Sequence, residues 1–520
     1  MMRRRTWAAA SGVLAVGLGV IAGELAAAAL SPSVTPVSAV GSTVIDLLPP
    51  GVKDWAIAWF GTADKPVLLV TIAVLIAGLA VTAGVLEYRR AFTGRAIVAG
   101  FGVLGVVAVA SRPQSSLVSF AGPVVAAVVA VLVLDALVRS LRAWARSDTR
   151  AGTADGDASP ARRRFLQGAG GAAVVAAATG AAATGVRSSQ STVTGQRSSI
   201  TLPAPTETVV PPPEGSFLPE GADLGIDGIS DLVTASDEFY RIDTALVVPV
   251  VDPARWSLKI TGLVEREVQI TFDELLALPL IERHVTLACV SNPVGGDLTG
   301  TARWLGFPVR ELLARAGVRP EADMVLSRSV DGFTAGTPLE ALTDGRDALL
   351  AVGMNGEPLP IEHGFPARLV VPGLYGFVSA TKWVEELKVT RFADDTAYWS
   401  TRGWSERGPV KTSSRIDVPR PSASVPAGDV VVGGVAWAQR RGIEAVEVRV
   451  DGGAWQRATL ARPISADTWC QYSATLQLPA GRHTVQSRAT DRRGGVQSDA
   501  MVDPAPDGAE GLHTVTFTVT

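Results

Sequence analysis

The sequence predicts three parts: an all-α transmembrane bundle, an α+β domain and a C-terminal β-sandwich. Most of the excess of apolar residues falls in the first 190 positions. From about residue 236, short β-rich runs alternate with turn signals and helical patterns, and after residue 418 regular short strands with glycine turns dominate. A chain of 520 residues is too long for one hydrophobic core, which supports a division into domains.

The composition excludes several kinds of metal centre. The two cysteines, Cys289 and Cys470, are too few for a Cys-ligated iron–sulfur cluster, a Cys-rich zinc site or a disulfide scaffold. The four histidines form no HExxH or HxxxH pair, and no CxxCH motif for covalent haem occurs. The net charge of −3 gives no support for a nucleic-acid partner. We therefore expect any metal to arrive with most of its own ligands.

Residues 1–146 are predicted to form a four-span transmembrane region. Each of four apolar stretches is close to the ~20 residues that a helix needs to cross the hydrocarbon core. The stretches are Trp7–Leu30, Val67–Leu86, Phe92–Ala110 and Leu117–Val138. The alternative is a set of core helices in a soluble protein, but runs of this length with almost no charge are rare there.

Arginines give the orientation of these spans. One basic cluster precedes the first span, one lies between the second and third, and one follows the fourth. The clusters are Arg3–Arg5; Arg89, Arg90 and Arg95; and Arg139, Arg142, Arg146 and Arg150. If the spans alternate, all three clusters lie on the cytoplasmic side.

A fifth apolar segment, within residues 160–187, follows a pair of arginines. Arg162–Gln167 leads into the Ala/Gly-rich run 168–186 and is similar to a twin-arginine export signal. The alternative is an ordinary membrane anchor with cytoplasmic arginines. Either way the segment sends everything after about residue 187 out of the cytoplasm, in a multi-pass protein of the cell membrane. Residues 188–225, which include Pro211–Pro213, are predicted to be an extended spacer.

Residues 226–418 are predicted to form the α+β domain. Strands are expected at 256–260, 284–289, 368–371 and 382–390, and helices at 272–278 and 309–316. Cys289 ends one apolar run beside a Gly-rich loop, where a thiolate can meet a ligand. Two alternatives are a buried, unreactive thiol and a disulfide with Cys470.

Cys289 is accompanied by a collinear set of short motifs. These are Phe239–Asp243, Ser329–Phe333, Met354–Pro360, His363–Arg368, Pro372–Gly376, Thr381–Trp383, Tyr398–Trp399 and Arg402–Trp404. The set closely resembles the molybdopterin-binding domain of the sulfite oxidase family. The resemblance implies a mononuclear molybdenum–molybdopterin cofactor, two-electron oxygen-atom transfer and an oxidoreductase activity.

The resemblance also implies roles for individual residues. Cys289 would be the metal ligand, Arg241 would serve catalysis and cofactor binding, and Tyr398 would hydrogen-bond the substrate oxygen. The other cofactor-binding residues would be Asn292, Asp331, His363, Arg368, Gly373, Gly376, Ser379 and Lys382. Cations and close backbone N–H groups are the partners that a buried phosphate requires.

One departure concerns the substrate. Sulfite oxidases of animals and plants have Asn-Arg-Arg after the cysteine, whereas Val290–Val294 here contains no arginine. Sulfite oxidation and the reduction of sulfoxides or other S- and N-oxides both remain open. No cytochrome b5 segment is present, so we expect electrons to pass to or from a separate carrier, either a cytochrome or a quinone-linked protein, or the membrane bundle. The remaining alternative is a non-catalytic membrane receptor or assembly protein.

Residues 419–520 are predicted to be an immunoglobulin-like sandwich, with strands near 445–450, 468–478, 483–489 and 514–520. This part resembles the dimerisation module of the same family, which implies a homodimer. Cys470 is expected to be a strand residue with no chemistry.

Overall fold

The structure, a computed structural model, describes residues 2–31, 34–47, 59, 64–112, 115–150, 160–171, 193–208, 218–245 and 247–520. The chain divides into two units, residues 1–192 with 245–248, and residues 193–244 with 249–520. Pro211–Pro213 and most of the predicted fifth span lie outside the described residues, although residues 160–171 are helical.

The first unit consists of helices. They are α1 (Met2–Leu30), α2 (Pro36–Leu47), α4 (Asp64–Arg89), α5 (Thr93–Ala110) and α6 (Ala121–Arg150), with the short 3-10 helix η2 (Leu117–Phe120). Among the described residues, four helices are long and apolar enough to cross a membrane. They coincide with the four predicted stretches.

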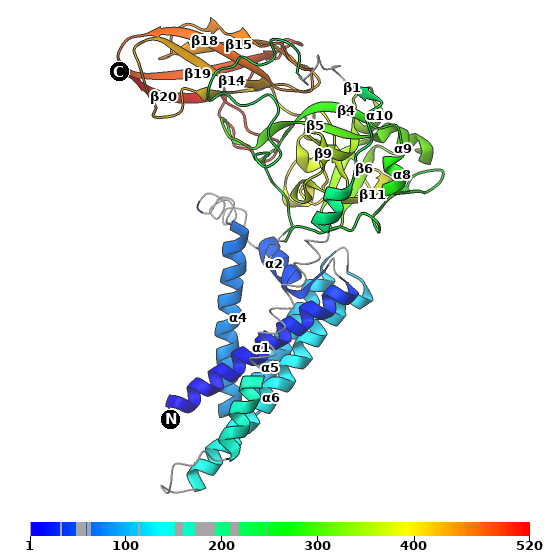
Figure 1. The fold of residues 1–520 in the computed structure, drawn as a ribbon, viewed down its shortest axis with the longest axis vertical. Helices are drawn as coiled ribbons and strands as arrows, with labels where there is room; N and C mark the ends of the chain where they lie inside the picture. Colours follow the sequence, from blue (N-terminus) through cyan, green and yellow to red (C-terminus); the bar gives the residue numbers. More distant parts are fainter. Residues whose placement is uncertain are drawn as a thin grey trace. The chain divides into compact units, whose positions relative to one another are not determined.

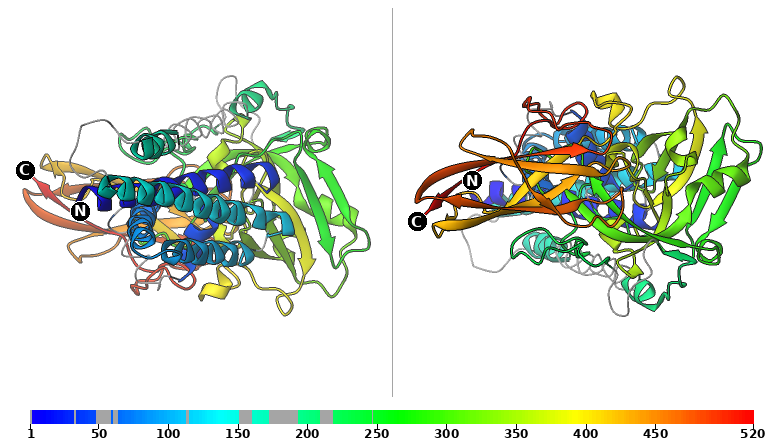
Figure 2. Two further views of the ribbon diagram at one scale, coloured as in Figure 1. Left: turned by 90° about the horizontal axis from the view of Figure 1, so that it is seen from below. Right: turned by 90° about the horizontal axis from the view of Figure 1, so that it is seen from above.

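Small residues let these helices approach closely. A Cβ atom at Gly12 of α1 would collide with the Ala80 carbonyl of α4, and one at Gly84 of α4 would collide with the Ala8 carbonyl of α1. Close contact at small side chains is how helices associate where no hydrophobic force acts between them. Figures 1 and 2 show α1 lying along α6 as well.

The second unit begins with two sheets that form the α+β domain. The first has the order β1-β4-β5-β8-β10, with β9 paired to β8, and the second has the order β3-β2-β11-β6-β7. The strands of the first sheet are β1 (Glu207–Thr208), β4 (Ile281–Ala288), β5 (Thr299–Pro308), β8 (Leu349–Met354), β9 (Glu357–Pro358) and β10 (Arg368–Val370). Those of the second are β2 (Ser257–Gly262), β3 (Val268–Thr271), β6 (Met324–Ser329), β7 (Thr334–Pro338) and β11 (Val384–Thr390).

Short helices connect these strands. They are α8 (Phe272–Leu276), α9 (Val309–Ala316), α10 (Leu339–Thr343), η3 (Ile361–His363), η4 (Gly376–Val378) and η5 (Ser400–Arg402). Helix α8 starts at a capping box, in which the Thr271 hydroxyl accepts from the Glu274 N–H and the Glu274 carboxylate accepts from the Thr271 N–H. The predicted strands and both predicted helices are present, with ends that differ by a few residues.

The predicted spacer is partly folded onto this domain, which corrects the expectation of an extended linker over 188–225. Residues 193–199 are helical, and β1 pairs in parallel with β4. Val193 is buried in the core beneath the first sheet, and Arg197 donates to the Leu359 carbonyl at 2.8 Å. Residues 193–208 therefore pack against the α+β domain through the few apolar side chains that stand among their polar ones.

The C-terminal part has two sheets around one core. The first has the order β12-β14-β18-β17 and the second β13-β20-β19-β15-β16. The strands are β12 (Ser413–Val418), β13 (Ser424–Val425), β14 (Gly428–Trp437), β15 (Ile443–Val450), β16 (Gln456–Arg457), β17 (Thr459–Leu460), β18 (Cys470–Leu478), β19 (Gly481–Asp491) and β20 (Thr514–Val519). Several of them are labelled in Figure 1. Val432, Val446, Tyr472, Val485 and Phe517 from both sheets share the core.

The predicted boundary between these parts is wrong by a few residues, because β12 precedes position 419 but pairs with β14. The more specific immunoglobulin-like assignment stays a prediction.

Strand β4 joins the α+β domain to the C-terminal part. The Thr286 hydroxyl accepts from the Trp469 N–H at 2.8 Å, and the Thr286 N–H donates to the Asp467 carbonyl at 2.9 Å. The Gln439 amide donates to the Thr286 carbonyl at 3.0 Å, and Thr286, Gln439 and Trp469 are all buried. Since buried polar groups must be paired, the two parts fix each other's position.

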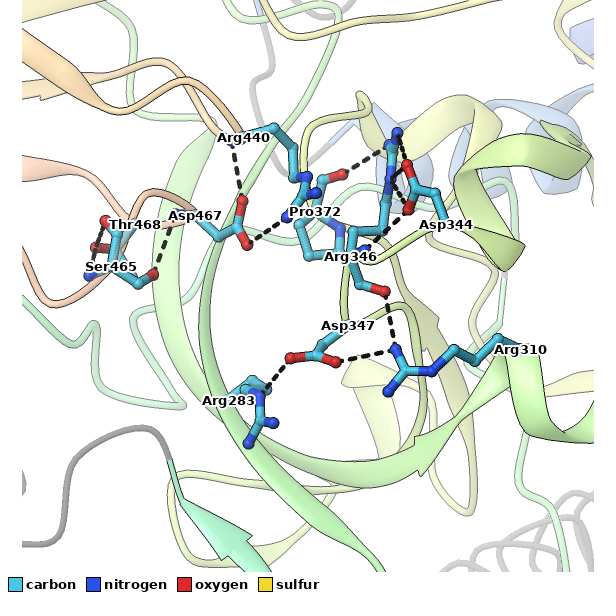
Figure 3. A network of polar contacts seen from close by, with 10 residues as sticks. All are labelled: Arg283, Arg310, Asp344, Arg346, Asp347, Pro372, Arg440, Ser465, Asp467 and Thr468. Carbon is cyan, nitrogen blue, oxygen red and sulfur yellow. Dashed lines mark hydrogen bonds and ion pairs between the residues drawn. The ribbon is translucent and has the colours of Figure 1, made fainter. Parts of the chain in front are cut away.

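Ion pairs extend this junction toward the surface (Figure 3). Asp467 accepts from the Arg440 N–H at 2.9 Å, and its carboxylate lies 3.5 Å from the Arg440 guanidinium. On the α+β side, Arg346 pairs with Asp344 at 2.8 Å and donates to the Pro372 carbonyl at 3.2 Å. The Asp347 carboxylate forms ion pairs with the guanidinium groups of both Arg283 and Arg310.

We predict that Thr286→Val lowers the melting temperature of the full-length protein by several degrees. Valine has a similar shape but leaves the Trp469 N–H buried without an acceptor, at a cost of about 1–3 kcal/mol. Thr286→Ser, which keeps the hydroxyl, and Thr475→Val at an exposed position of β18 are the controls. A Thr286→Val protein as stable as Thr286→Ser would show that the junction does not depend on this hydrogen bond.

Candidate active site

A cavity opens at the end of β4 where Cys289 follows the strand. Its lining contains Cys289 and several charged or aromatic side chains from five separate segments. The lining residues are Phe239, Tyr240, Ile242, Asp243, Thr244, Cys289, Val290, Ser291, Ser329, Asp331, Phe333, His363, Arg368, Gly376, Phe377, Ala380, Lys382, Trp383, Trp399 and Trp404. We call this the first cavity. Of the predicted site residues it brings together Cys289, Asp331, His363, Arg368, Gly376 and Lys382.

Cys289 is held by backbone hydrogen bonds on both sides. Its N–H donates to the Leu298 carbonyl at 2.9 Å, and its carbonyl accepts from the Asn292 N–H at 3.2 Å. Burial raises the pKa of the Cys289 thiol, and hydrogen bonds from the Ser291 backbone and side chain oppose that rise. Both cysteines are free thiols, so the disulfide alternative is wrong. Cys470 begins β18 in the C-terminal core, so the prediction that it is a strand residue is confirmed.

Arg368 is a buried cation without a carboxylate partner among the described residues. Its guanidinium donates to the His363 carbonyl at 3.1 Å and lies 5.1 Å from the centre of the Trp304 ring. Burial lowers the pKa of Arg368 to about 10. A charge taken out of water needs an opposite charge to compensate it, so this position favours a bound anion.

Lys382 lies on the same wall and shares a carboxylate with Arg241. Asp243 is 2.9 Å from the Lys382 ammonium and 2.9 Å from the Arg241 guanidinium. Burial lowers the pKa of Lys382 to about 8, although Asp243 opposes that shift. Arg241 itself is not in the lining, and 40% of its side chain is exposed.

His363 is a neutral imidazole. Burial and the nearby Arg368 and Lys382 charges lower its pKa to about 4. Its Nε2 lies 2.9 Å from the Ser236 carbonyl, which can only accept, so the proton is on Nε2 and Nδ1 is left with a lone pair. An aromatic edge-to-face contact with Phe239 holds the ring.

Two more predicted residues shape loops beside the cavity. The Asn292 side-chain oxygen accepts from the Leu298 N–H at 2.9 Å, which closes the loop after Cys289. The Asp331 carboxylate accepts from the Phe333 N–H and the Thr244 hydroxyl, both at 3.3 Å.

Besides Arg241 and Asn292, three further predicted residues lie outside the first-cavity lining. Gly373 has φ +84°, and a Cβ atom there would lie 2.6 Å from Cγ of Arg440, so this glycine admits a side chain of the C-terminal part. Ser379 is buried and donates to the Tyr375 carbonyl at 2.9 Å. The Tyr398 ring packs under the Arg402 guanidinium at 3.6 Å, while its neighbour Trp399 reaches the cavity.

Tyr240 is a site residue that the sequence did not single out. It lies in the lining directly before Arg241, and its ring stacks on Phe239 at 5.1 Å. Burial raises its pKa, the nearby Cys289 acts in the same direction, and Arg368 opposes them. Its hydroxyl therefore remains a neutral donor close to the thiol. The only signal in the sequence was its place inside the Phe239–Asp243 motif.

Cys289 also lines a second cavity, between the α+β domain and the C-terminal part. The lining residues are Ala288, Cys289, Asn292, Pro293, Val294, Gly295, Tyr375, Lys411, Thr412, Ser413, Ser414, Trp437, Gly495, Val496, Gln497, Ser498, Ala509, Glu510 and Gly511. Among the described residues, no group of three or more His, Cys, Asp or Glu side chains could hold a metal ion. A metal bound by Cys289 must therefore bring its other ligands.

Comparisons with known proteins agree with this arrangement. Residues 245–399 match the oxidoreductase molybdopterin binding domain. Sulfite oxidase of Gallus gallus is 28% identical over 331 residues, which cover 54% of this chain and 72% of that protein. Mitochondrial sulfite oxidase of Homo sapiens is 30% identical over 306 residues, or 49% of this chain and 56% of that protein. The uncharacterized oxidoreductase YuiH of Bacillus subtilis (strain 168) is 34% identical over 161 residues, or 30% of this chain and 76% of that protein.

The first cavity fits a molybdopterin cofactor. The uncompensated Arg368 guanidinium and the neighbouring Lys382 suit a phosphate group, which needs cations in a desolvated site. A single protein thiol suits a metal that takes its remaining sulfur ligands from the pterin. The cavity lining, the motif order and the sequence similarity agree, and the chain belongs to the sulfite oxidase family of molybdopterin-dependent oxidoreductases.

Proposed function

We propose that this chain is a membrane-anchored molybdenum enzyme that transfers an oxygen atom to or from a small sulfur or nitrogen oxo compound outside the cytoplasm. The position of Cys289 supports this best, because the thiol lies between an anion-binding cavity and a second cavity. When bound, the cofactor supplies two-electron oxygen-atom transfer. Membership of an oxidoreductase family disfavours the alternative of a non-catalytic receptor.

Different residues of the chain would bind different parts of the cofactor. Cys289 would ligate the metal, while Arg368 and Lys382 would hold the cofactor phosphate. Neutral His363, through Nδ1, would accept a hydrogen bond from the pterin without adding charge. The remaining predicted contacts of Arg241, Asn292, Asp331, Gly373, Gly376, Ser379 and Tyr398 belong to the same proposal.

The surroundings of the enzyme follow from the N-terminal helices and from the composition. Four candidate spans would anchor it in the cell membrane. Electrons would pass to or from a separate carrier, a cytochrome or a quinone-linked protein. The two C-terminal sheets would form an immunoglobulin-like module that supports a homodimer.

Sulfoxide reduction is the second candidate function. The segment after Cys289 has Pro293 and Val294, and Val294 lines the second cavity. A dianion bound there would meet an apolar side chain, which favours a neutral oxo compound.

We predict that Cys289→Ala abolishes turnover while the protein stays folded and keeps its pterin. The thiol would be lost from the metal, but the phosphate contacts of Arg368 and Lys382 are separate from it. Turnover, circular dichroism and cofactor content are measured together. Cys470→Ala, a change of the same size in the C-terminal core, is the control. Full activity of Cys289→Ala would refute the assignment of the ligand.

We also predict that reporter fusions at about residues 90 and 230 report opposite compartments. The basic residues near position 90 favour the cytoplasm, and an odd number of spans would carry position 230 outside. Replacing Arg162 and Arg163 by Lys is expected to block export, whereas the same changes at Arg3 and Arg4 are not. Identical compartments for the two fusions would contradict the five-span arrangement.

Sulfite is expected to have a high KM rather than only a low kcat. Loss of one close cation from a partly desolvated anion site costs on the order of 2–4 kcal/mol, or roughly 30- to 1000-fold in binding. Arg241 cannot fully replace it, because Asp243 pairs with it. Steady-state kinetics at two ionic strengths test this, with Val294→Arg expected to lower the KM and Val294→Gln as its uncharged control. A micromolar KM in the unaltered enzyme would refute the argument.

A further inference from the structure

The second cavity reaches Cys289 from the side of the C-terminal part. Cys289 is only 8% exposed, whereas Val496 in the same lining is 56% exposed, so the cavity leads from solvent to the thiol. The α+β domain contributes the loop after Cys289, and the C-terminal part contributes Trp437 and residues 495–498 and 509–511. The proposed phosphate anchors Arg368 and Lys382 line the first cavity, and Asn292 is the one predicted cofactor-binding residue in the lining of the second, which we assign to a different ligand.

Lys411 is the one cationic side chain among the second-cavity lining residues, and its charge is compensated. Its ammonium lies 3.0 Å from the Asp507 carboxylate and 2.9 Å from the Glu510 carboxylate, and it donates to the Gly508 carbonyl at 2.7 Å. Two carboxylates around one ammonium leave a net negative charge. An oxyanion entering here would meet no uncompensated cation.

The neutral polar groups of this cavity are mostly occupied as well. The Gln497 side-chain oxygen accepts from the Ser414 hydroxyl at 2.8 Å and from the Ala489 N–H at 3.0 Å, and its amide nitrogen donates to the Gly511 carbonyl at 2.8 Å. The Thr412 hydroxyl donates to Asp491 at 2.8 Å. These groups therefore stabilise the wall and have little left for a ligand.

Tyr375 differs from them. Its side chain is 5% exposed, and its hydroxyl accepts a weak hydrogen bond from the Lys411 N–H at 3.4 Å. In the part of the chain that the structure describes, no acceptor is within hydrogen-bond reach of the Tyr375 proton. The cavity thus offers one buried neutral donor near Cys289, which suits the oxygen of an uncharged S=O or N–O group.

We propose that the second cavity binds the oxo substrate and selects uncharged sulfoxides or amine N-oxides over oxyanions. Tyr375 donates to the substrate oxygen, and Asp507 and Glu510 mask the charge of Lys411. This inference rests on the proposed function and names its substrate class.

The test compares two probes of similar shape that differ in charge, dimethyl sulfone and methanesulfonate. Their dissociation constants are measured on the full-length, cofactor-loaded enzyme by ligand-observed NMR, without turnover. We expect dimethyl sulfone to bind at least about tenfold more tightly than methanesulfonate, and the difference to shrink at high salt. Tyr375→Phe is expected to weaken dimethyl sulfone roughly three- to tenfold and to leave methanesulfonate unchanged.

A second experiment tests the role of Asp507 and Glu510 with variants of these two residues and the same two probes. Asp507→Asn combined with Glu510→Gln exposes the charge of Lys411, so methanesulfonate is expected to bind about as well as dimethyl sulfone or better. Adding Lys411→Met must remove that gain. Glu444→Gln, the same chemical change at an exposed position of β15, must leave both probes unaffected. Melting temperature and pterin content establish that each variant is folded and loaded.

Several results would overturn the inference. They are a preference of the unaltered enzyme for methanesulfonate, no binding of dimethyl sulfone, or an unchanged probe ratio in the Asp507/Glu510 variant. Failure of the proposed function would look different: Cys289→Ala would stay active, while the probes could still discriminate by charge.

Discussion

The pairing of β4 with both neighbouring parts of the chain is the constraint on which the site depends. Val285 and Leu287 point into the core beneath the first sheet, whereas Thr286 between them bonds to residues of the C-terminal part. Side chains alternate along a strand, so Thr286 faces away from that core, and Cys289, three residues further along, lines both cavities. Cys289 therefore follows β4 at the one place where both cavities meet, and its position is set by packing on two sides.

The two cavities differ in how their cations are paired. In the first, Arg368 is buried without a carboxylate and is held by carbonyl oxygens and the Trp304 ring. In the second, Lys411 has two carboxylates around it. Electrostatic interactions gain strength away from water, so this difference in pairing would favour an anion beside Arg368 and disfavour one beside Lys411. The same thiol thus lines one cavity that has a cation without a carboxylate partner among the described residues and another whose lysine is paired with two carboxylates.

Much of the architecture could be predicted from local patterns in the sequence. Val309–Ala316 has the apolar spacing of a helix, and the four long apolar stretches match the four candidate spans, because both properties depend on neighbouring residues. The motif order also gave Cys289, Arg368 and Lys382. Contacts between residues that are far apart in the chain could not be predicted from such local patterns. Whether Lys411 carries an effective charge depends on Asp507 and Glu510, about a hundred positions away, and Gly373 proved to contact Arg440, in the turn after β14 of the C-terminal part. The docking of residues 193–208 was missed because a few apolar residues stand among many polar ones.

The composition of the second cavity has a consequence for the order in which the protein is made. Its wall includes Gly495–Ser498 and Ala509–Gly511, which follow the whole α+β domain in the chain and leave the ribosome after it. Domains form from the N-terminus onward during synthesis, so the α+β domain can fold while this wall is still missing. During that interval the thiol is open on the side where the finished protein encloses it. Closure of the second cavity then follows folding of the α+β domain, and a nascent chain stalled before residue 495 would hold every lining residue of the first cavity but not of the second.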